Sequence, residues 1–363
     1  MGPEQAKACS SCFYTSQFPG IKIEENGKCN FCNSGNFAAL KSRQTPRNLE
    51  ALRRLAKGLK EAREAKNGKY DCIVGCSGGL DSSYVLYVAK KLLGLNPLAV
   101  KYDHGFNYEL ANRNVKALCE SLGVDLKIVK SQGGHDRNCF KYRVKALGPL
   151  GNYFGVCSFC GYACHAVILL AAGEHNLPFF LVSNNFWELG DLDQRFKIKS
   201  SLKAFWDANF IQKAKTLFYL AVSQYYLMRL KMEFYVPPAR NLFRRQPKLK
   251  IKGGPGPAFW FNVTEYVPWD LNQMVKTLES ETGWRAPEAP QLPMRFDCII
   301  EDGFVNHTRK KTAGMTVHGV IASRLIADNL RTKDELQPTV EFYDQEISEQ
   351  IKEMEQALGL KPR

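Results

Sequence analysis

Six consecutive residues in the first half of the chain combine the types that bind phosphate: Ser77-Gly78-Gly79-Leu80-Asp81-Ser82. The patterns on either side predict a buried strand over 71–76 and a helix over 81–93. The two glycines let successive backbone N–H groups point into one concavity, and the N-terminal end of a helix carries partial positive charge. Hydroxyl donors can come from three serines: Ser77, Ser82 and Ser83. The spacing predicts a phosphate-binding loop.

Ser77 and Asp81 are the candidate catalytic residues of this loop, since a carboxylate there can hold Mg²⁺ or order the loop. No Walker spacing, GxxxxGK[ST], is present. The loop resembles instead that of the PP-loop ATP pyrophosphatase superfamily. The resemblance implies that ATP, with Mg²⁺, is cleaved between its α and β phosphates, and that all six loop residues and Ser83 contact the nucleotide.

Two further segments are candidates for nucleotide contact. Lys101-Tyr102-Asp103-His104-Gly105-Phe106 ends a second expected strand and resembles the Asp-His-Gly turn of the superfamily. Asp103, His104 and Gly105 are therefore predicted to lie near the nucleotide, although a simple polar turn has the same composition. Asn185, in Ser183-Asn184-Asn185 with Glu188 after a later strand, is a third candidate.

Four cysteines near the N-terminus form two CxxC pairs separated by sixteen residues: Cys9, Cys12, Cys29 and Cys32. Two such pairs place four thiolates around a tetrahedral Zn²⁺. The segment has little else from which to build a core, so the ion would supply its folding energy. We expect a structural zinc site, with a redox pair or free thiols as the alternative.

A second cysteine group cannot close a metal site by itself. Cys157 and Cys160 form one CxxC pair, Cys164 follows, and Cys298 is the available distant ligand. Cys157, Cys160 and Cys298 would suit an iron–sulfur cluster or a second Zn²⁺. The alternative is that these residues are small apolar side chains of a core.

Strands and helices alternate around these motifs. Strands are expected over 71–76, 97–102, 125–129 and 179–183, and helices over 47–66, 81–93, 109–122 and 166–175. This alternation predicts an α/β fold of the PP-loop (HUP-like) kind, a parallel sheet with helices on both faces. We expect three segments: a zinc-knuckle module over 1–46, an ATP-binding domain over 47–193, and a basic, aromatic, mainly helical region over 194–363.

Charge is spread unevenly over the 363 residues, which carry a net charge of +14. Between Gln194 and Trp260 there are fourteen Lys and Arg but only two acidic residues. Such a segment favours an anionic ligand, although a solvated basic face is the plain alternative. No run of eighteen apolar residues and no apolar N-terminal leader is present, so we expect a cytoplasmic protein without a membrane span.

Beyond the loop, the chain resembles the N-acetyl sugar amidotransferase family of bacterial surface-polysaccharide (O-antigen type) synthesis. The resemblance is carried by the following motifs: Cys9-Ser10-Ser11-Cys12, 77–82, Cys157-Ser158-Phe159-Cys160, Trp269-Asp270, Gly283-Trp284-Arg285-Ala286-Pro287-Glu288, Arg295-Phe296-Asp297-Cys298 and Leu330-Arg331-Thr332-Lys333-Asp334-Glu335. It implies that ATP activates the acetamido carbonyl of a nucleotide-linked sugar and that ammonia replaces the adenylate. The ammonia would come from a separate glutaminase of the imidazole-glycerol-phosphate-synthase type. Residues 304–315 depart from the Tyr/Gly-rich form of the family.

Two other functions fit parts of the sequence. A tRNA thiolase of the same superfamily would explain the positive charge and the cysteine groups. Its basic segment, however, carries core-like aromatic residues, and no second zinc knuckle lies near the C-terminus. A non-catalytic zinc-ribbon adaptor is the third hypothesis, and the intact phosphate loop argues against it.

Overall fold

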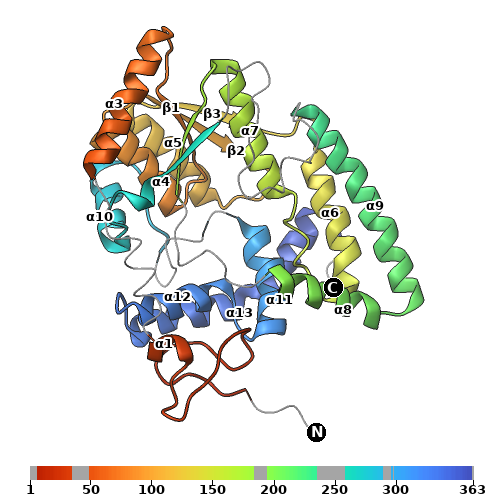
Figure 1. Cartoon of the computed structure of the whole chain (residues 1–363). Helices are drawn as coiled ribbons and strands as arrows, with labels where there is room; N and C mark the ends of the chain where they lie inside the picture. Colours follow the sequence, from red (N-terminus) through yellow and green to blue (C-terminus); the bar gives the residue numbers. More distant parts are fainter. Residues whose placement is uncertain are drawn as a thin grey trace.

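A parallel five-stranded sheet organises the molecule in the computed structural model, which describes residues 6–34, 49–183, 194–234, 258–288, 296 and 298–361 (Figure 1). The strand order is β3-β2-β1-β4-β5, and every neighbouring pair is parallel. The strands are β1 (Cys72–Gly75), β2 (Pro97–Tyr102), β3 (Asp125–Val129), β4 (Phe179–Val182) and β5 (Phe259–Asn262). The predicted α/β fold with a parallel sheet is confirmed.

Both faces of the sheet are covered because side chains alternate along each strand. In β1, Cys72 and Val74 point into one core, while Ile73 points into the other. The first core receives residues from α3 (Leu49–Ala65), α4 (Leu80–Tyr87), α5 (Glu109–Leu122) and α10 (Leu271–Glu281). The second receives residues from α6 (His135–Leu147), α7 (Cys160–His175) and α9 (Phe210–Glu233).

The first residues of the chain pack against its last third. The N-terminal cysteine module, residues 6–34 with the short helix α1 (Asn30–Ser34), shares a core with the end of α11 (Asn306–Ala313) and with α12 (Val317–Ala327). The backbone N–H of Phe13 donates to Ser323 Oγ at 3.1 Å. Figure 1 shows the module beside α12, which is followed by the long helix α13 (Lys333–Ala357).

The sequence predicted most of these elements, and the exceptions are instructive. The helix expected over 109–122 has those bounds, whereas α7 begins at Cys160 rather than at 166. Strand β5 and helix α6 were not predicted. β5 comes from the region expected to be mainly helical, so that region contributes an edge strand to the sheet. The boundaries expected after residues 46 and 193 lie outside the described residues, and the division into three segments stays a prediction.

Candidate functional site

The phosphate loop begins where β1 ends. β1 lies between β2 and β4, and the chain runs outward in one direction through β2 and β3, then in the other through β4 and β5. The loop thus sits at the point where the strand order reverses, which is where ligands bind in open parallel sheets. The turn after β2 reaches the same edge, because Gly75 is in register with Val100 and the N–H of Cys76 donates to the Val100 carbonyl at 2.9 Å.

Hydrogen bonds within the loop hold it in a closed shape. The backbone N–H of Ser77 donates to Ser82 Oγ, and the two serine hydroxyl oxygens are 3.1 Å apart. The N–H of Gly79 donates to Ser77 Oγ at 3.3 Å. Gly79 is the N-cap of α4 and has no side chain with which to cap that helix. The N–H groups of the first turn and the helix dipole therefore face the loop, an arrangement suited to an anion.

Gly78 is required by the packing as well as by the backbone. Its φ of +99° lies in the region that L side chains rarely adopt, and a Cβ there would be 2.0 Å from the carbonyl oxygen of Ala111 on α5. Glycine thus lets the loop lie directly against α5. The sequence alone explained Gly78 by the conformational freedom of glycine. The structure adds a second reason, the close approach of the α5 backbone at Ala111.

Distant residues that the sequence analysis did not assign to the site hold the loop from outside. The Trp269 Nε1–H donates to Asp81 Oδ1 at 2.7 Å, and the Trp284 Nε1–H donates to the Gly78 carbonyl at 3.1 Å. Lys101 Nζ, on a side chain that is 3% exposed, donates to the Ser77 carbonyl at 2.7 Å. The Trp269-Asp270 and Gly283–Glu288 motifs were a usable signal, since both carry these tryptophans.

The predicted residues in the turn after β2 have different surroundings: Asp103 pairs with a lysine, whereas His104 is buried in the core. Asp103 Oδ1 accepts the N–H of Gly105 at 2.9 Å, and Asp103 Oδ2 pairs with Lys130 Nζ at 2.8 Å. Burial alone would raise the pKa of Asp103, but the hydrogen bonds from Lys130 and from the Gly105 N–H outweigh it and lower this pKa. His104 is buried among aromatic rings, with Phe140 at 5.8 Å between ring centroids. Asn185 lies outside the described residues, so its role stays a prediction.

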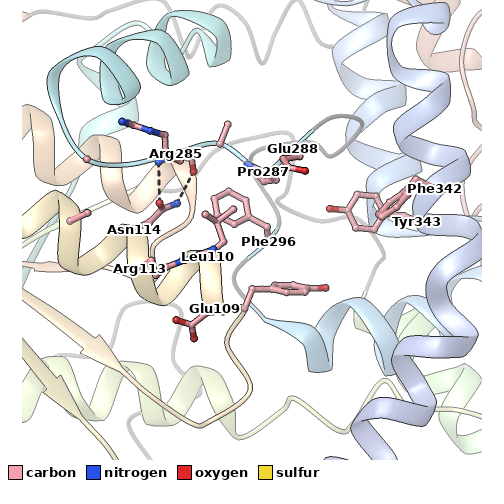
Figure 2. Close-up of a pocket in the computed structure, with 14 residues that line it drawn as sticks. Glu109, Leu110, Arg113, Asn114, Arg285, Pro287, Glu288, Phe296, Phe342 and Tyr343 are labelled. Carbon is pink, nitrogen blue, oxygen red and sulfur yellow. Dashed lines mark hydrogen bonds between the residues drawn. The ribbon is translucent and has the colours of Figure 1, made fainter.

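A cavity of about 950 Å³ opens beside the loop between α5, residues 283–288 and α13 (Figure 2). On one side Asn114 bonds the Arg285 backbone twice, its Oδ1 accepting the N–H at 3.0 Å and its Nδ2 donating to the carbonyl at 2.8 Å. Phe342 and Tyr343 of α13 form the opposite side, and Phe296 lies between. Because Asn114 Nδ2 also reaches the Gly78 carbonyl at 3.5 Å, the wall of the cavity adjoins the phosphate loop.

Charged side chains of both signs complete this cavity. Glu109 and Arg113 come from the first turns of α5, and Glu288 from the segment 283–288. The Arg285 guanidinium is used elsewhere, since it donates to carbonyl oxygens at the end of α10, including that of Thr282 at 3.3 Å. Aromatic rings with a few polar groups are typical of pockets for small organic ligands, and the volume falls within their usual range of roughly 300–1,000 Å³.

The four N-terminal cysteines meet as predicted. Their Sγ atoms all lie within 4.8 Å of one another, with Cys9–Cys32 at 3.9 Å and Cys12–Cys29 at 3.8 Å. A tetrahedral ion with Zn–S bonds of about 2.3 Å requires sulfur separations of about 3.8 Å. This cluster can therefore hold a metal ion such as zinc.

Backbone N–H groups point at these sulfur atoms. The N–H of Cys29 donates to Cys9 Sγ at 3.2 Å, and that of Ser11 donates to the same atom at 3.4 Å. Burial would raise the pKa of the Cys9 thiol, but these donors outweigh burial and lower the pKa to about 7. Burial raises the pKa of Cys29 to about 11. A bound cation would stabilise all four thiolates.

The second cysteine group is looser. Cys157 and Cys160 lie at the start of α7, and Cys164 follows one turn later. Cys298 interacts electrostatically with both Cys157 and Cys160, so the structure brings the predicted three residues into one neighbourhood together with Cys164. Among the described residues only the N-terminal four form a cluster with all ligand atoms within 4.8 Å. Burial raises the pKa of the Cys157 thiol, and a metal at this second group stays a prediction.

Residues 51–136 match the family model described as NAD synthase. These residues contain the phosphate loop, strands β1 to β3, and helices α4 and α5. They are an NAD-synthase-like domain of the PP-loop ATP pyrophosphatase superfamily. The N-terminal cysteine module and the chain after the first residues of α6 lie outside the match.

Individual relatives agree with this match. Glutamine-dependent NAD(+) synthetases of two strains of Xylella fastidiosa are each 38% identical over 86 residues, which are 23% of this chain and 15% of each relative. An uncharacterized protein of Methanocaldococcus jannaschii is 32% identical over 123 residues, 33% of this chain and 42% of that protein. The chain thus spans less than half the length of these curated relatives.

Proposed function

We propose that this protein is a cytoplasmic ATP-dependent amidotransferase that converts the acetamido group of a nucleotide-linked N-acetyl sugar into an acetamidino group, for surface-polysaccharide synthesis. The observation that carries the adenylation chemistry is the closed, uncapped phosphate loop at the switch point of the sheet. The sugar comes from the family resemblance of the sequence, and the cavity beside the loop supports it. Adenylation and the identity of the acceptor can be tested separately.

ATP would lie with its phosphates on the loop. The first turn of α4 faces the loop, and Ser77 and Ser82 add hydroxyl groups. The Gly79 N–H, which donates to Ser77 Oγ, would turn to the phosphate. Asp81, oriented by Trp269, suits Mg²⁺, which commonly takes one or two protein carboxylates and phosphate oxygens. Bound Mg²⁺ would neutralise charge that develops on the departing pyrophosphate.

The acceptor would occupy the cavity between α5 and α13. Its aromatic rings suit a nucleobase, and Arg113 on the α5 wall suits the diphosphate. Through Asn114 this cavity adjoins Gly78, so a sugar placed toward the loop could present its acetamido oxygen to the α-phosphorus of ATP. That oxygen forms the new P–O bond as the bond to pyrophosphate breaks. Ammonia then adds to the activated carbon, loses a proton, and AMP leaves with the former carbonyl oxygen.

Ammonia is favoured over sulfur as the second nucleophile. The Xylella relatives are glutamine-dependent synthetases, and glutamine is a nitrogen donor. We therefore propose a separate glutaminase of the imidazole-glycerol-phosphate-synthase type as partner. The four N-terminal cysteines would hold a structural Zn²⁺, whose closed Cys₄ coordination leaves no position for catalysis.

A second candidate follows from the family match over residues 51–136: amidation of the deamido form of NAD(+). The same loop chemistry serves both reactions, because each begins with adenylation of a carbonyl or carboxylate oxygen. The two reactions differ in the acceptor molecule that binds in the cavity.

The deciding experiment measures ATP-dependent pyrophosphate release with ammonium chloride as nitrogen source. Separate reactions would contain UDP-linked acetamido sugars, deamido-NAD(+) or bulk tRNA. Release with a sugar, and a product one mass unit lighter as oxygen becomes NH, is the expected result. Release only with deamido-NAD(+) or only with tRNA would overturn the sugar assignment and leave adenylation intact. Binding of ATP without release on any acceptor, with the glutaminase partner supplied, would contradict the enzyme and favour the adaptor.

A further inference from the structure

Exposed apolar residues gather on one pair of helices. Among the described residues, fifteen large hydrophobic side chains are exposed, and ten of them lie on α8 (Gln194–Asp207) and α9. These ten are Ile198, Leu202, Trp206, Phe210, Ile211, Leu217, Phe218, Tyr225, Met228 and Met232. We call them and the basic residues between them the α8–α9 face. Single exposed apolar residues are ordinary on a protein surface, but such a concentration marks an interaction site.

Helix α9 carries apolar side chains on its outward side as well as on its packed side, unlike an ordinary surface helix. Its buried side includes Thr216 and Ser223, which contact α6: Thr216 Oγ1 donates to the Ala146 carbonyl at 3.0 Å, and Ser223 Oγ accepts from Arg143 Nε at 3.0 Å. Its outward side carries Phe218, which is 63% exposed. A helix buries its apolar stripe when the protein supplies a core for it. Here Leu230 is buried and Leu220 and Leu227 pack against the second core, yet a second apolar side remains exposed, which marks a surface for a partner.

The helix does not depend on that partner to form. Asn209 and Gln212 make a capping box, with each side chain bonding the backbone N–H of the other at 2.9 and 3.1 Å. In Figure 1, α9 runs along the outer side of the molecule next to α6. Helix α9 is thus held against α6, and α8 is tied to the fold through Asn152, which bonds the hydroxyl groups of Ser200 and Ser201 at 2.9 and 3.2 Å.

The same two helices are rich in basic residues. Residues 194–233 contain eight basic residues: Arg195, Lys197, Lys199, Lys203, Lys213, Lys215, Arg229 and Lys231. Against them stand only Asp207 and Glu233, and Glu233 accepts hydrogen bonds from the Ser131 hydroxyl and the Gln132 N–H, which direct its charge toward the body of the protein. Lys213 lies over the Trp206 ring at 5.6 Å, so basic and aromatic side chains are interleaved.

We propose that the α8–α9 face binds the surface of an anionic membrane. Six of the eight basic residues are lysines, a residue type that is depleted in protein–protein interfaces and that interfacial membrane helices favour. Aromatic, Leu and Met side chains enter the headgroup boundary, and the lysines pair with anionic lipids. Among the described residues, none of the helices has the length and hydropathy of a membrane span.

Vesicle co-sedimentation of the full chain tests this proposal. Vesicles of phosphatidylcholine alone would be compared with vesicles containing about 30% phosphatidylglycerol, at low and high salt. Binding to the anionic vesicles, weakened by salt and absent on neutral vesicles, is expected. The double change Phe218→Asp and Met228→Asp should reduce binding at least about tenfold, and Lys203→Glu with Lys215→Glu should reduce it comparably.

Matched controls separate membrane binding from misfolding and from self-association. Leu92→Asp changes an exposed leucine outside the α8–α9 face and should bind as the unchanged protein does. Circular dichroism would show that each variant is folded, since the changed side chains are exposed. The absence of binding to anionic vesicles would overturn the proposal. So would a stable dimer in light scattering that Phe218→Asp dissolves, because the face would then join two copies of the chain.

Discussion

The phosphate loop and the N-terminal cysteine module are both short motifs, yet they are held in opposite ways. The loop is fixed by residues far away in the chain, with Trp269, Trp284 and Asn114 all contacting it. The module has a small core and brings four sulfur atoms to one point. The loop thus takes its geometry from the tertiary fold, whereas the module, whose small core includes residues at the end of α11 and on α12, also requires an ion in our proposal.

This difference separates chemistry from stability. A change in the loop should alter the reaction while the fold survives, because the sheet and helices around it do not depend on the ligand. A change in the module should unfold that part of the chain and leave the loop intact. Substitutions in each region therefore test whether the loop governs activity and the module governs stability.

Gly78→Ala should have the largest effect. A Cβ 2.0 Å from the Ala111 carbonyl oxygen forces the loop to move by about 1 Å, and a displacement of that size can cost about 100-fold in rate. We expect pyrophosphate release to fall by at least that factor. Gly123→Ala is the matched control, since Gly123, at the end of α5, also has a positive φ, +59°, but nothing lies within 4 Å of an added Cβ. Equal activity of the two variants would contradict the role of the loop.

Cys29→Ser should empty the N-terminal site. Metal analysis of protein purified without chelator should fall from about one Zn²⁺ per chain to nearly none, and proteolysis should cut residues 6–34 first, because the ion stabilises the module. Cys157→Ser is the control and should keep that zinc. A loss of iron or of a second zinc in Cys157→Ser would instead establish a metal at the looser cysteine group.

The features that the sequence predicted are those set by residues close together in the chain. The types and spacing of Ser77 to Ser82 predicted a turn between a strand and a helix, and the separation of the four N-terminal cysteines predicted that they would meet. The sequence could not predict the contacts of Trp269 and Trp284 with the loop, because they arise from packing across roughly two hundred positions. β1 and β4 are equally short but were recognised by their place in the alternation of strands and helices, whereas β5 (Phe259–Asn262) lies outside that alternation, after Pro255 and Pro257.

Trp269→Phe should have an intermediate effect. It removes the indole donor to Asp81 Oδ1 and keeps most of the apolar contact, so the carboxylate loses its orientation. Pyrophosphate release should fall about tenfold, with a raised requirement for Mg²⁺. Trp260→Phe is the control, because Trp260 stacks on Phe180 with ring centroids 4.5 Å apart, on the side of the sheet opposite the loop helix. An unchanged Mg²⁺ requirement in Trp269→Phe would remove the proposed link between the tryptophan and the metal.

Asp103→Asn should have the smallest effect, and its sign depends on pH. Because the folded protein lowers the pKa of Asp103, the pair with Lys130 stabilises the fold above about pH 4, and this contribution is lost as the pH falls through the folded-state pKa. Lys130 is largely exposed, so we expect a loss of only about 0.5 kcal/mol at pH 7. Urea unfolding from pH 3 to pH 7 should show the two proteins converging in acid; a constant difference would contradict the assignment.

The central claim is that a substrate oxygen attacks the α-phosphorus of ATP at the loop. The most direct test uses a UDP-linked sugar whose acetamido carbonyl carries ¹⁸O, with ATP and ammonium, and mass spectrometry of the nucleotide products. We predict that AMP gains the label, two mass units heavier, while the acetamidino product loses it. Formation of ADP, or AMP without label, would contradict adenylation of the sugar amide.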